Sequence, residues 1–438
     1  DGDDAIDTCT TDCTTDADND STVDCTDTYL DTDGDGGVDV SGGMHDAGDH
    51  VKFGLPQCYT AATLLWGLYE FEQAFIDTGE YDHMIDICKW FTDYFLRSAF
   101  FDNSGNLIAF CYQVGEGDTD HNYWGVPELQ DVELYPRPAY FATVEPPASD
   151  QCAGTAAALT IMSFVYEKID AAYAARCLDT AIALYDFAVA HRGLGYAGTF
   201  YQSMYDEDEL SWAAAWLYEA TGEMRYIEDI SSTDTSGYYT GYMKKIITSP
   251  EDTWQNIWVH CWDAVWGGAF VKLAILFPED EKFDYFARWN IELWSNGMVP
   301  HEDPNDTSYV FYTPGGYGML NTWGSARYNC AAQLCALIFG KHRNRTDMAE
   351  WSKNQMTYIM GDNPMGRSYI VGYSDDYARH PHHRAAHGST TNSMYDPPEH
   401  RHVLWGALVG GPDSSDRHVD ATDDYIHNEV AIDYNAGL

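Results

Sequence analysis

The sequence predicts an all-α protein in which about six helical hairpins form a closed ring. From Tyr59 onward, apolar residues such as Ala62, Leu65, Trp66 and Tyr69 recur three and four positions apart, which is the period of an amphipathic helix. Strand-like alternation is rare along the chain. The helical stretches also come in neighbouring pairs, and a ring of such pairs buries every apolar stripe.

The expected helices follow one another with short connections. After the stretch that starts at Tyr59, they cover 82–101, 152–170, 172–191, 208–221, 223–231, 236–247, 263–277, 280–296, 323–340 and 346–361. Tight turns join 152–170 to 172–191 and 263–277 to 280–296, so these pairs are predicted to be antiparallel neighbours. The longer loops should then form one face of the ring; they cover 102–150, 196–207, 250–262, 297–322 and 364–424.

Composition limits the classes of partner. The chain has 438 residues, of which 45% are hydrophobic and 15% aromatic, and its formal net charge is −47. Coulomb repulsion makes nucleic acid and anionic membrane poor partners, whereas a neutral polymer such as a polysaccharide is not repelled. The excess of Asp over Lys fits adaptation to concentrated salt, where repulsion is screened, and it equally fits solubility outside the cell.

The first 41 residues differ from the rest. Residues 1–41 are rich in Asp, Thr, Gly and Ser and lack apolar periodicity, so we expect a loop or arm there and a single domain over 42–438. Segment 31–36 has the carboxylate spacing and the sixth-position Gly of a calcium loop, but Gly42 stands where the closing Glu belongs. A calcium loop and a solvated acidic turn both remain open.

Eleven cysteines are more than a cytosolic enzyme usually carries. Cys9, Cys13 and Cys25 lie in the polar segment, which favours disulfides and secretion. Three others fall in apolar helical patterns, where a cysteine acts as a small buried hydrophobe; they are Cys88, Cys177 and Cys261. No segment reaches the roughly 18 apolar residues of a membrane span, so we expect a soluble, extracellular protein in its mature form, without any signal peptide it once had.

Two carboxylates stand three residues apart before the first long helix. Asp46 and Asp49 flank Gly48, and such a pair can hold and orient a water molecule that one of the two deprotonates. Near the other end of the chain, Glu429 sits among apolar and aromatic residues that should raise its pKa. A base and an acid of this kind suggest a glycosidase with two catalytic carboxyl groups.

The predicted loops also carry aromatic and imidazole groups. The segment 120–128 combines His121, Trp124 and carboxylates, a mixture that suits the apolar faces and polar edges of sugar rings. Trp254, Trp258 and Trp262 are four residues apart, and they form either a core stripe or, for Trp258, part of a cleft. The histidines of segment 379–388 could grasp hydroxyl groups or, alternatively, bind a metal.

Several motifs follow one another in one order over about residues 38–438. They are Asp46-Ala47-Gly48-Asp49-His50-Val51-Lys52-Phe53, Asp120-His121 with Trp124 and Pro127-Glu128, Asp208-Glu209-Leu210, Trp323-Gly324-Ser325-Ala326-Arg327-Tyr328, Pro381-His382-His383-Arg384 and Asn428-Glu429-Val430-Ala431 with Asp433-Tyr434-Asn435-Ala436-Gly437. Together these motifs resemble glycoside hydrolase family nine, the inverting cellulases.

The resemblance implies an (α/α)6 toroid with an open cleft, and a monomer that hydrolyses internal β-1,4 bonds of glucan with inversion and without a catalytic cofactor. It makes Asp49 the general base, Asp46 its partner in positioning water, and Glu429 the general acid, with the carboxyls roughly 6.5–9.5 Å apart. It implies substrate contacts for His382, Arg384, Tyr434, His121, Trp124, Trp258, Tyr201, Trp323 and Asp420, the last of which matches a carboxylate of the C-terminal signature.

The resemblance further implies a structural calcium ion held by Asp208, Glu209 and Asp263, whose hard oxygens suit calcium. The chain departs from the family pattern where the opening helix is replaced by the acidic arm, and His45 stands where an aromatic residue is usual. An exo-acting or processive enzyme, or one acting on another β-glucan, would keep the same carboxylates. A catalytically inactive glucan-binding relative would have lost Asp49 or Glu429, and both are present.

Overall fold

The computed structural model describes residues 8–9, 38–196, 198–247, 260–295 and 310–438. Within these residues, five helical hairpins follow one another and a short helix, α13 (Ile432–Ala436), lies near the C-terminus. The hairpins are α1 (Gly54–Thr78) with α2 (Tyr81–Arg97), α4 (Ser149–Tyr166) with α5 (Ala171–Ala190), α6 (Glu207–Thr221) with α7 (Arg225–Ser231), α8 (Trp266–Leu276) with α9 (Glu281–Ser295), and α10 (Ser325–Arg343) with α11 (Thr346–Ile359).

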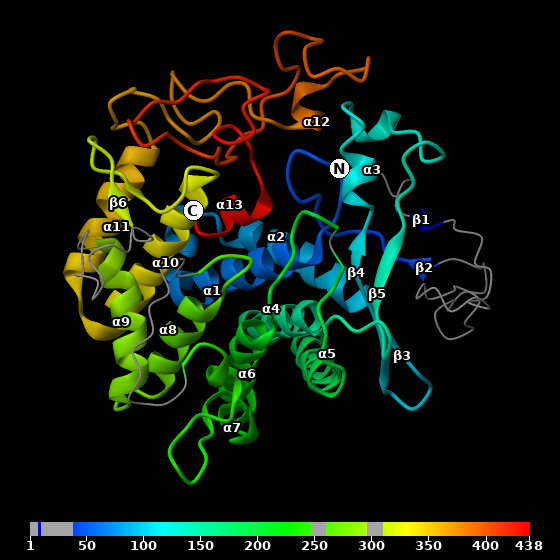
Figure 1. Cartoon of the computed structure of the whole chain (residues 1–438), viewed down its shortest axis with the longest axis vertical. Helices are drawn as coiled ribbons and strands as arrows, with labels where there is room; N and C mark the ends of the chain where they lie inside the picture. Colours follow the sequence, from blue (N-terminus) through cyan, green and yellow to red (C-terminus); the bar gives the residue numbers. More distant parts are fainter. Residues whose placement is uncertain (1–7, 10–37, 197, 248–259, 296–309) are drawn as a thin grey trace.

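The first helix of each hairpin belongs to an inner ring. Helix α1 contacts α4, α4 contacts α6, α6 contacts α8, α8 contacts α10, α10 contacts α13, and α13 returns to α1. The second helix of each hairpin packs outside its own partner (Figure 1). This arrangement confirms the predicted ring of helices, and α13 is the short sixth member that closes it.

Left-handed residues end several helices where the hairpins turn. Gly79 after α1 has φ 81°, Gly222 after α6 has φ 71°, and Asn344 after α10 has φ 55°. Glycine and asparagine adopt this conformation more readily than other residues, and it satisfies the last carbonyl groups of the helix. These residues therefore explain why neighbouring helices run antiparallel with short connections.

The predicted loop 102–150 contains a small sheet, which corrects the expectation of loop throughout. Strands β3 (Ala99–Phe101), β4 (Leu107–Val114) and β5 (Ala139–Ala142) pair antiparallel in the order β3-β4-β5. Helix α2 accordingly stops at Arg97 rather than at 101. Nearly all of β4 is buried, so its sequence shows no apolar–polar alternation and the usual sign of a strand is missing.

Four further strands and four short helices complete the described elements. Strand β1 (Thr8–Cys9) pairs with β2 (Val38–Asp39), and β6 (Phe311–Tyr312) pairs with β7 (Gly318–Met319). The short helices are α3 (Gly117–Asp120), η1 (Pro127–Leu129), η2 (Tyr242–Lys245) and α12 (Arg384–His387). Helices α3 and α12 lie with the long loops at one end of the ring (Figure 1).

The helix expected over 236–247 is wrong. This segment forms turns followed by the single turn of η2. Gly237 has φ 84°, and a Cβ on Gly241 would lie 2.5 Å from the carbonyl oxygen of Asp229. The backbone here turns sharply against α7, so tertiary packing overrides the apolar spacing.

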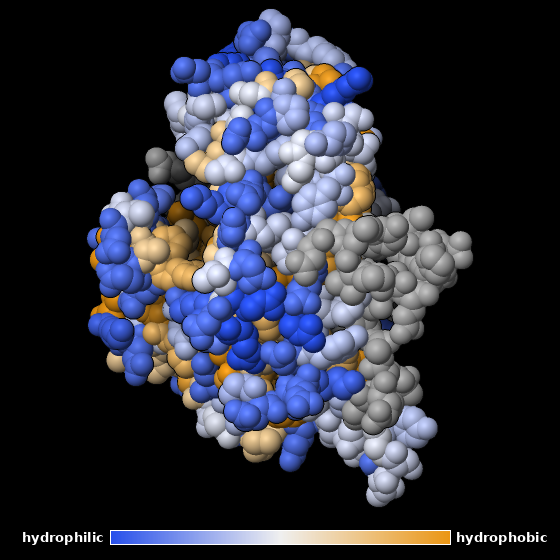
Figure 2. All heavy atoms as spheres, turned by 90° about the vertical axis from the view of Figure 1, so that its left-hand side faces the viewer, coloured by the Kyte–Doolittle hydropathy of each residue, from blue (hydrophilic) through white to orange (hydrophobic). Residues whose placement is uncertain are grey.

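Aromatic residues fill the centre of the ring. Trp66 of α1 packs against Trp212 of α6 with ring centroids 5.1 Å apart, and Trp212 packs against Trp216 at 5.5 Å. Cys88, Cys177 and Cys261 are buried free thiols, as the apolar pattern predicted. On the outside, Figure 2 shows hydrophilic side chains over most of one face, with apolar patches between them. Among the described helices, none has the length and apolarity to cross a bilayer.

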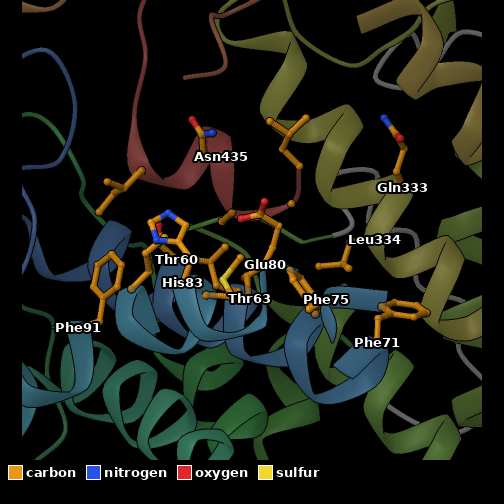
Figure 3. Close-up of a pocket in the computed structure, with 18 of the residues that line it drawn as sticks. Thr60, Thr63, Phe71, Phe75, Glu80, His83, Phe91, Gln333, Leu334 and Asn435 are labelled. Carbon is orange, nitrogen blue, oxygen red and sulfur yellow. The ribbon is translucent and has the colours of Figure 1, made fainter. Parts of the chain in front are cut away.

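A mainly apolar groove of about 660 Å³ lies between the inner and outer helices near α13. Phe71 and Phe75 of α1, Phe91 of α2, and Leu334 of α10 contribute to its wall (Figure 3). Asn435 of α13 lines the same groove. The lining includes none of the predicted catalytic carboxylates, so this groove is separate from the site described next.

Candidate active site

Asp46 and Asp49 lie on the segment that leads from β2 into α1. Their exposed fractions are 1% and 5%. The backbone N–H of Asp46 donates to the carbonyl of Val51 at 2.9 Å, and the N–H of Val51 donates to Asp49 Oδ1 at 2.8 Å. Lys52 forms a β-bridge with Val114 of β4. These bonds fix the turn, so both carboxylates have defined positions.

Backbone hydrogen bonds join three segments that are distant in sequence to form the surroundings of Asp46 and Asp49. The N–H of Arg384 donates to Gly48 O at 3.0 Å, and the N–H of His382 donates to Asn428 O at 2.7 Å. The N–H of Ile432 donates to Asp46 O at 2.8 Å. The Asp46–Asp49 turn, the His382 loop and the Glu429 segment therefore form one site.

Glycine is required at position 48. A Cβ on Gly48 would lie 2.2 Å from the carbonyl oxygen of His382, a distance that side-chain carbon atoms do not adopt without a shift of the backbone. The small residue therefore lets the turn that carries the two carboxylates approach the His382 loop directly.

Glu429 accepts two hydrogen bonds on the same oxygen. The indole N–H of Trp323 donates to Oε2 at 3.0 Å, and the Tyr434 hydroxyl donates to it at 3.2 Å. Burial raises the pKa of Glu429 to about 7; the Trp323 bond and Arg327 oppose this rise, and the charge of Asp49 adds to it. Glu429 can therefore hold a proton near neutral pH, as a general acid must.

The two aspartates also have raised pKa values. Burial and the neighbouring charge of Asp49 place the pKa of Asp46 well above its ordinary value, while the Tyr201 hydroxyl acts in the opposite direction. Burial likewise raises the pKa of Asp49, and the nearby His121 lowers it. Apart from the Tyr201 hydroxyl, neither oxygen of Asp46 has a hydrogen-bond partner within the described structure, so this carboxyl group can also accept from a water molecule or a sugar hydroxyl.

His121 and Tyr201 stand beside the aspartates. His121 Nε2 is 3.7 Å from Asp49 Oδ2, and its ring stacks on Phe200 with centroids 4.4 Å apart. The Tyr201 ring packs between Phe53 and Trp262, with both centroid distances 4.9 Å. The structure thus brings both predicted residues to the site, with His121 close enough to influence the charge of Asp49.

His382, Arg384 and Trp124 form a packed group. Arg384 is 3% exposed, its Nε donates to Tyr123 O at 2.7 Å, and its guanidinium lies 4.9 Å from the Trp124 ring. Trp124 is only 6% exposed and meets the His382 ring edge-on at 4.8 Å. Burial lowers the pKa of His382 to about 4, so this imidazole is neutral near pH 7 and can exchange hydrogen bonds with a neutral sugar.

The remaining predicted sugar contacts lie in different surroundings. Trp323 is 45% exposed and packs on Tyr425 at 5.2 Å, whereas Tyr434 is 1% exposed.

Asp420 accepts the backbone N–H groups of Arg379 and His380, both at about 3 Å, so it braces the His382 loop. Trp258 lies outside the described residues; Trp262, the last member of its spacing pattern, lies in a turn.

Two residues of the site had no predicted role. Asp433 is 2% exposed and lies 3.4 Å from Arg327 Nη1, while the Arg327 guanidinium stacks 5.3 Å from the Tyr434 ring. The charge of Asp433 raises the pKa values of both Asp46 and Glu429. The sequence signal was present, since Asp433 follows Glu429 by four residues and α13 carries it toward the same space.

Asp208 and Glu209, which we term the acidic pair, lie in the first turn of α6 on the inner ring. Asp208 Oδ2 accepts the N–H of Val265 at 2.9 Å, while its other oxygen and both oxygens of Glu209 have no hydrogen-bond partner within the described structure apart from each other. Asp263 instead accepts the Cys261 thiol at 2.7 Å. Among the described residues, no three His, Cys, Asp or Glu side chains are grouped as a metal centre.

Comparison with known proteins gives consistent relatives. A model of the family described as Glycosyl hydrolase family 9 matches residues 8–438. Endoglucanase A of Bacillus pumilus is 38% identical over 422 residues, which cover 94% of this chain and 60% of that relative. Endoglucanase 4 of Bacillus sp. (strain KSM-522) is 37% identical and 62% covered. The chain thus spans about three-fifths of the length of these relatives.

Solved structures agree with the sequence comparisons. The catalytic domain of Clostridium thermocellum CelT superposes with a TM-score of 0.80 and 43% identity, covering 93% of this chain and 82% of that one. The cellulase Cel9M of C. cellulolyticum superposes with a TM-score of 0.78 and 41% identity, covering 91% and 86%. The family model, the ring of helices and the meeting of the motif segments around Asp46, His121, His382 and Glu429 agree, and the chain belongs to glycosyl hydrolase family 9.

Proposed function

We propose that this protein hydrolyses internal β-1,4-glucosidic bonds of cellulose or a related β-glucan, with inversion at the anomeric carbon. The observation that carries the proposal is the juxtaposition of Asp49 and Glu429, because the charge of Asp49 raises the pKa of Glu429 across the site. The endoglucanase relatives support the choice of substrate. So does a similar solved structure, that of endoglucanase CelQ from Clostridium thermocellum complexed with cellotetraose.

In the proposed reaction, Asp49 accepts a proton from a water molecule whose oxygen attacks the anomeric carbon. Glu429 donates its proton to the glycosidic oxygen as the bond from that oxygen to the anomeric carbon breaks. The attack comes from the face opposite the leaving group, so a β-linkage yields an α-anomer. Asp46 helps to orient the water, and each cycle returns one proton from Asp49 to Glu429 through solvent.

The surrounding residues support binding in the same proposal. His382, Arg384 and Tyr434 lie beside the two carboxyl groups, and Trp323 offers a half-exposed ring to a glucose face. Trp124 acts through Arg384 and His382, against which it packs. We assign Asp420 the support of the loop, and we keep Trp258 as a predicted subsite residue outside the described part.

Proton NMR of the products from a soluble cello-oligosaccharide tests the proposal, with the anomer observed before mutarotation. Release of the α-anomer supports inversion by Asp49 and Glu429. Release of the β-anomer would overturn the mechanism, and an absence of products with retained binding would point to an inactive glucan-binding relative. The products from a long soluble glucan separate internal cleavage from exo-acting or processive cleavage, because only internal cuts shorten the polymer quickly.

The variants Asp49→Asn and Glu429→Gln test the assignment of the two roles. Each removes one ionisable carboxyl with little change in shape, so turnover should fall by several orders of magnitude while substrate binding stays near normal. Near-native turnover in either variant would show that the role is misassigned. Calorimetry with cellotetraose measures substrate binding by each variant. Retained binding shows that the substrate-binding site is intact and that the loss of turnover comes from the missing carboxyl group.

We also propose a structural calcium ion at the acidic pair. Two adjacent, buried carboxylates repel each other, and burial raises the pKa of Asp208 to about 7. A cation there would offset the repulsion, and carboxylate oxygens suit calcium. Asp263 would have to release the Cys261 thiol to join them, so backbone carbonyls would supply further ligands.

Further proposals concern the setting of the enzyme. We infer secretion as a monomer, since a polymeric glucan lies outside the cell and a net charge of −47 opposes self-association. The domain boundary at residue 42 and the arm over 1–41 remain predictions. The predicted disulfides concern Cys9, Cys13 and Cys25, whose side chains lie outside the described structure, as does the alternative calcium loop at 31–36.

A further inference from the structure

A buried polar network lies directly behind the turn that carries Asp49. Asp120, the last residue of α3, accepts the backbone N–H of His50 on Oδ1 at 3.1 Å. Its other oxygen accepts Gln130 Nε2 at 3.0 Å, and Gln130 Oε1 is 2.8 Å from His50 Nδ1. Asp120 therefore holds the residue after Asp49 twice, once by its backbone and once by its ring through Gln130.

Arg137 completes the network from the side of β5. Its Nη1 donates to the carbonyl of His50 at 2.6 Å and lies 3.8 Å from Asp120 Oδ2. Asp120, His50 and Gln130 are 3%, 2% and 7% exposed. Hydrogen bonds that are shielded from water hold the positions of the groups they join firmly. A buried carboxylate without hydrogen-bond partners would lower the stability of the fold.

The network is separate from the bonds that the reaction itself uses. Within the part of the chain that the structure describes, no hydrogen bond joins Asp120 to an oxygen of Asp49, and the bonds of the network end on the backbone and ring of His50. Yet Asp120 is close enough for its charge to raise the pKa of Asp49. Other charged or titratable groups near Asp49 in the described structure include His50, His121, Arg384, Asp46 and Glu429.

We propose that Asp120 is a positioning residue for the general base, holding the Asp49 turn through His50 with the help of Gln130 and Arg137. The inference rests on the proposed function, since it takes Asp49 as the base. Two consequences follow. The carboxylate fixes where Asp49 stands, and its negative charge keeps Asp49 more basic than it would otherwise be.

The test compares Asp120→Asn with Asp118→Asn and with the unchanged enzyme. Asp118 lies on the same short helix but is exposed, so it reports the effect of the substitution alone. Kinetics on cellotetraose across a pH series give kcat, KM and the acid limb of kcat/KM. A third variant, Gln130→Met, removes the bridge to the His50 ring while leaving the charge of Asp120 in place.

We expect Asp120→Asn to lower kcat by about tenfold or more, as small displacements of a catalytic group do, with KM little changed. Its acid limb should move to lower pH, because the loss of the negative charge lowers the pKa of Asp49. Gln130→Met should lower kcat without moving that limb. Asp118→Asn should match the unchanged enzyme in both respects.

The inference is overturned if the pH profile and kcat of Asp120→Asn coincide with those of Asp118→Asn. If Asp120→Asn does not fold, Gln130→Met decides, and full kcat in that variant overturns the inference. These outcomes differ from failure of the proposed function, in which the unchanged enzyme itself would release no α-anomer from the oligosaccharide.

Discussion

Replacing Trp323 by Phe should move the alkaline limb of the pH profile upward. The indole N–H of Trp323 donates to Glu429 Oε2 at 3.0 Å and thereby stabilises the ionised carboxylate. Phe keeps an aromatic ring at the site but cannot donate. The ionised form loses that stabilisation, so Glu429 holds its proton to higher pH.

The size of the shift follows from the strength of the bond. A hydrogen bond to a charged group contributes about 1.5–3 kcal/mol, and we take a value just below this range because Trp323 is 45% exposed and solvent weakens the contact. About 1.4 kcal/mol corresponds to about one pKa unit. The pKa of Glu429, which burial raises to about 7, should therefore rise to about 8. A general acid works only while protonated, so activity should persist about one pH unit further into the alkaline range.

The assay is the rate of cellotetraose hydrolysis from pH 4 to pH 10. The pH dependence of kcat/KM reports the pKa values of the acid and the base in the free enzyme. Tyr425→Phe is the matched control, because Tyr425 packs on Trp323 at 5.2 Å and this change removes a hydroxyl but no indole donor. We expect the alkaline limb of Tyr425→Phe to stay in place. An unchanged or lowered limb in Trp323→Phe would refute the assignment of Glu429 as the acid controlled by this bond.

Three other changes test separate parts of the site. Gly48→Ala places a Cβ 2.2 Å from the carbonyl oxygen of His382, so we expect a clear loss of kcat on cellotetraose. A native KM and kcat would contradict the need for the Gly48 turn to lie so close to the His382 loop. Arg384→Lys loses the planar group that stacks on Trp124, so KM should rise by about tenfold, or about 1.4 kcal/mol; an unchanged KM would remove Arg384 from the binding site. Chelation with EDTA should lower the unfolding temperature if calcium occupies the acidic pair, and added calcium should restore it; no change on chelation would exclude a stabilising ion there.

Much of the ring could be predicted from the sequence because helix periodicity is a local property. The spacing of apolar residues in α1 or α10 needs only neighbouring side chains to be recognised, and left-handed residues such as Gly222 mark where the helices turn back. The strand β4 and the turn over 236–241 escaped prediction. In the first, burial on both faces removes alternation, and in the second, close packing against α7 overrides the local pattern.

The proposed catalytic residues, Asp46, Asp49 and Glu429, could be predicted from the short motifs that contain them, whereas their surroundings could not. Asp420 and Trp124 appear in motifs as candidate sugar contacts, and the fold shows one bracing a loop and the other packed beneath Arg384. Asp433 and Asp120 lie in motifs quoted from the sequence, but their contacts were identified only from the fold. Their partners, Arg327 and His50, are distant in sequence, and sequence spacing carries no information on such contacts.

By itself, the sequence determined the helical class, the family resemblance and the choice of the three candidate carboxylates, because these depend on periodicity and on residues close together in the chain. Asp49 and Glu429 are 380 positions apart in the sequence. Only the tertiary structure decided that they lie close enough for the charge of Asp49 to raise the pKa of Glu429. It also decided the pKa of Glu429, because burial and the charges of Asp49, Asp433 and Arg327 act through space and exist only once the ring has closed.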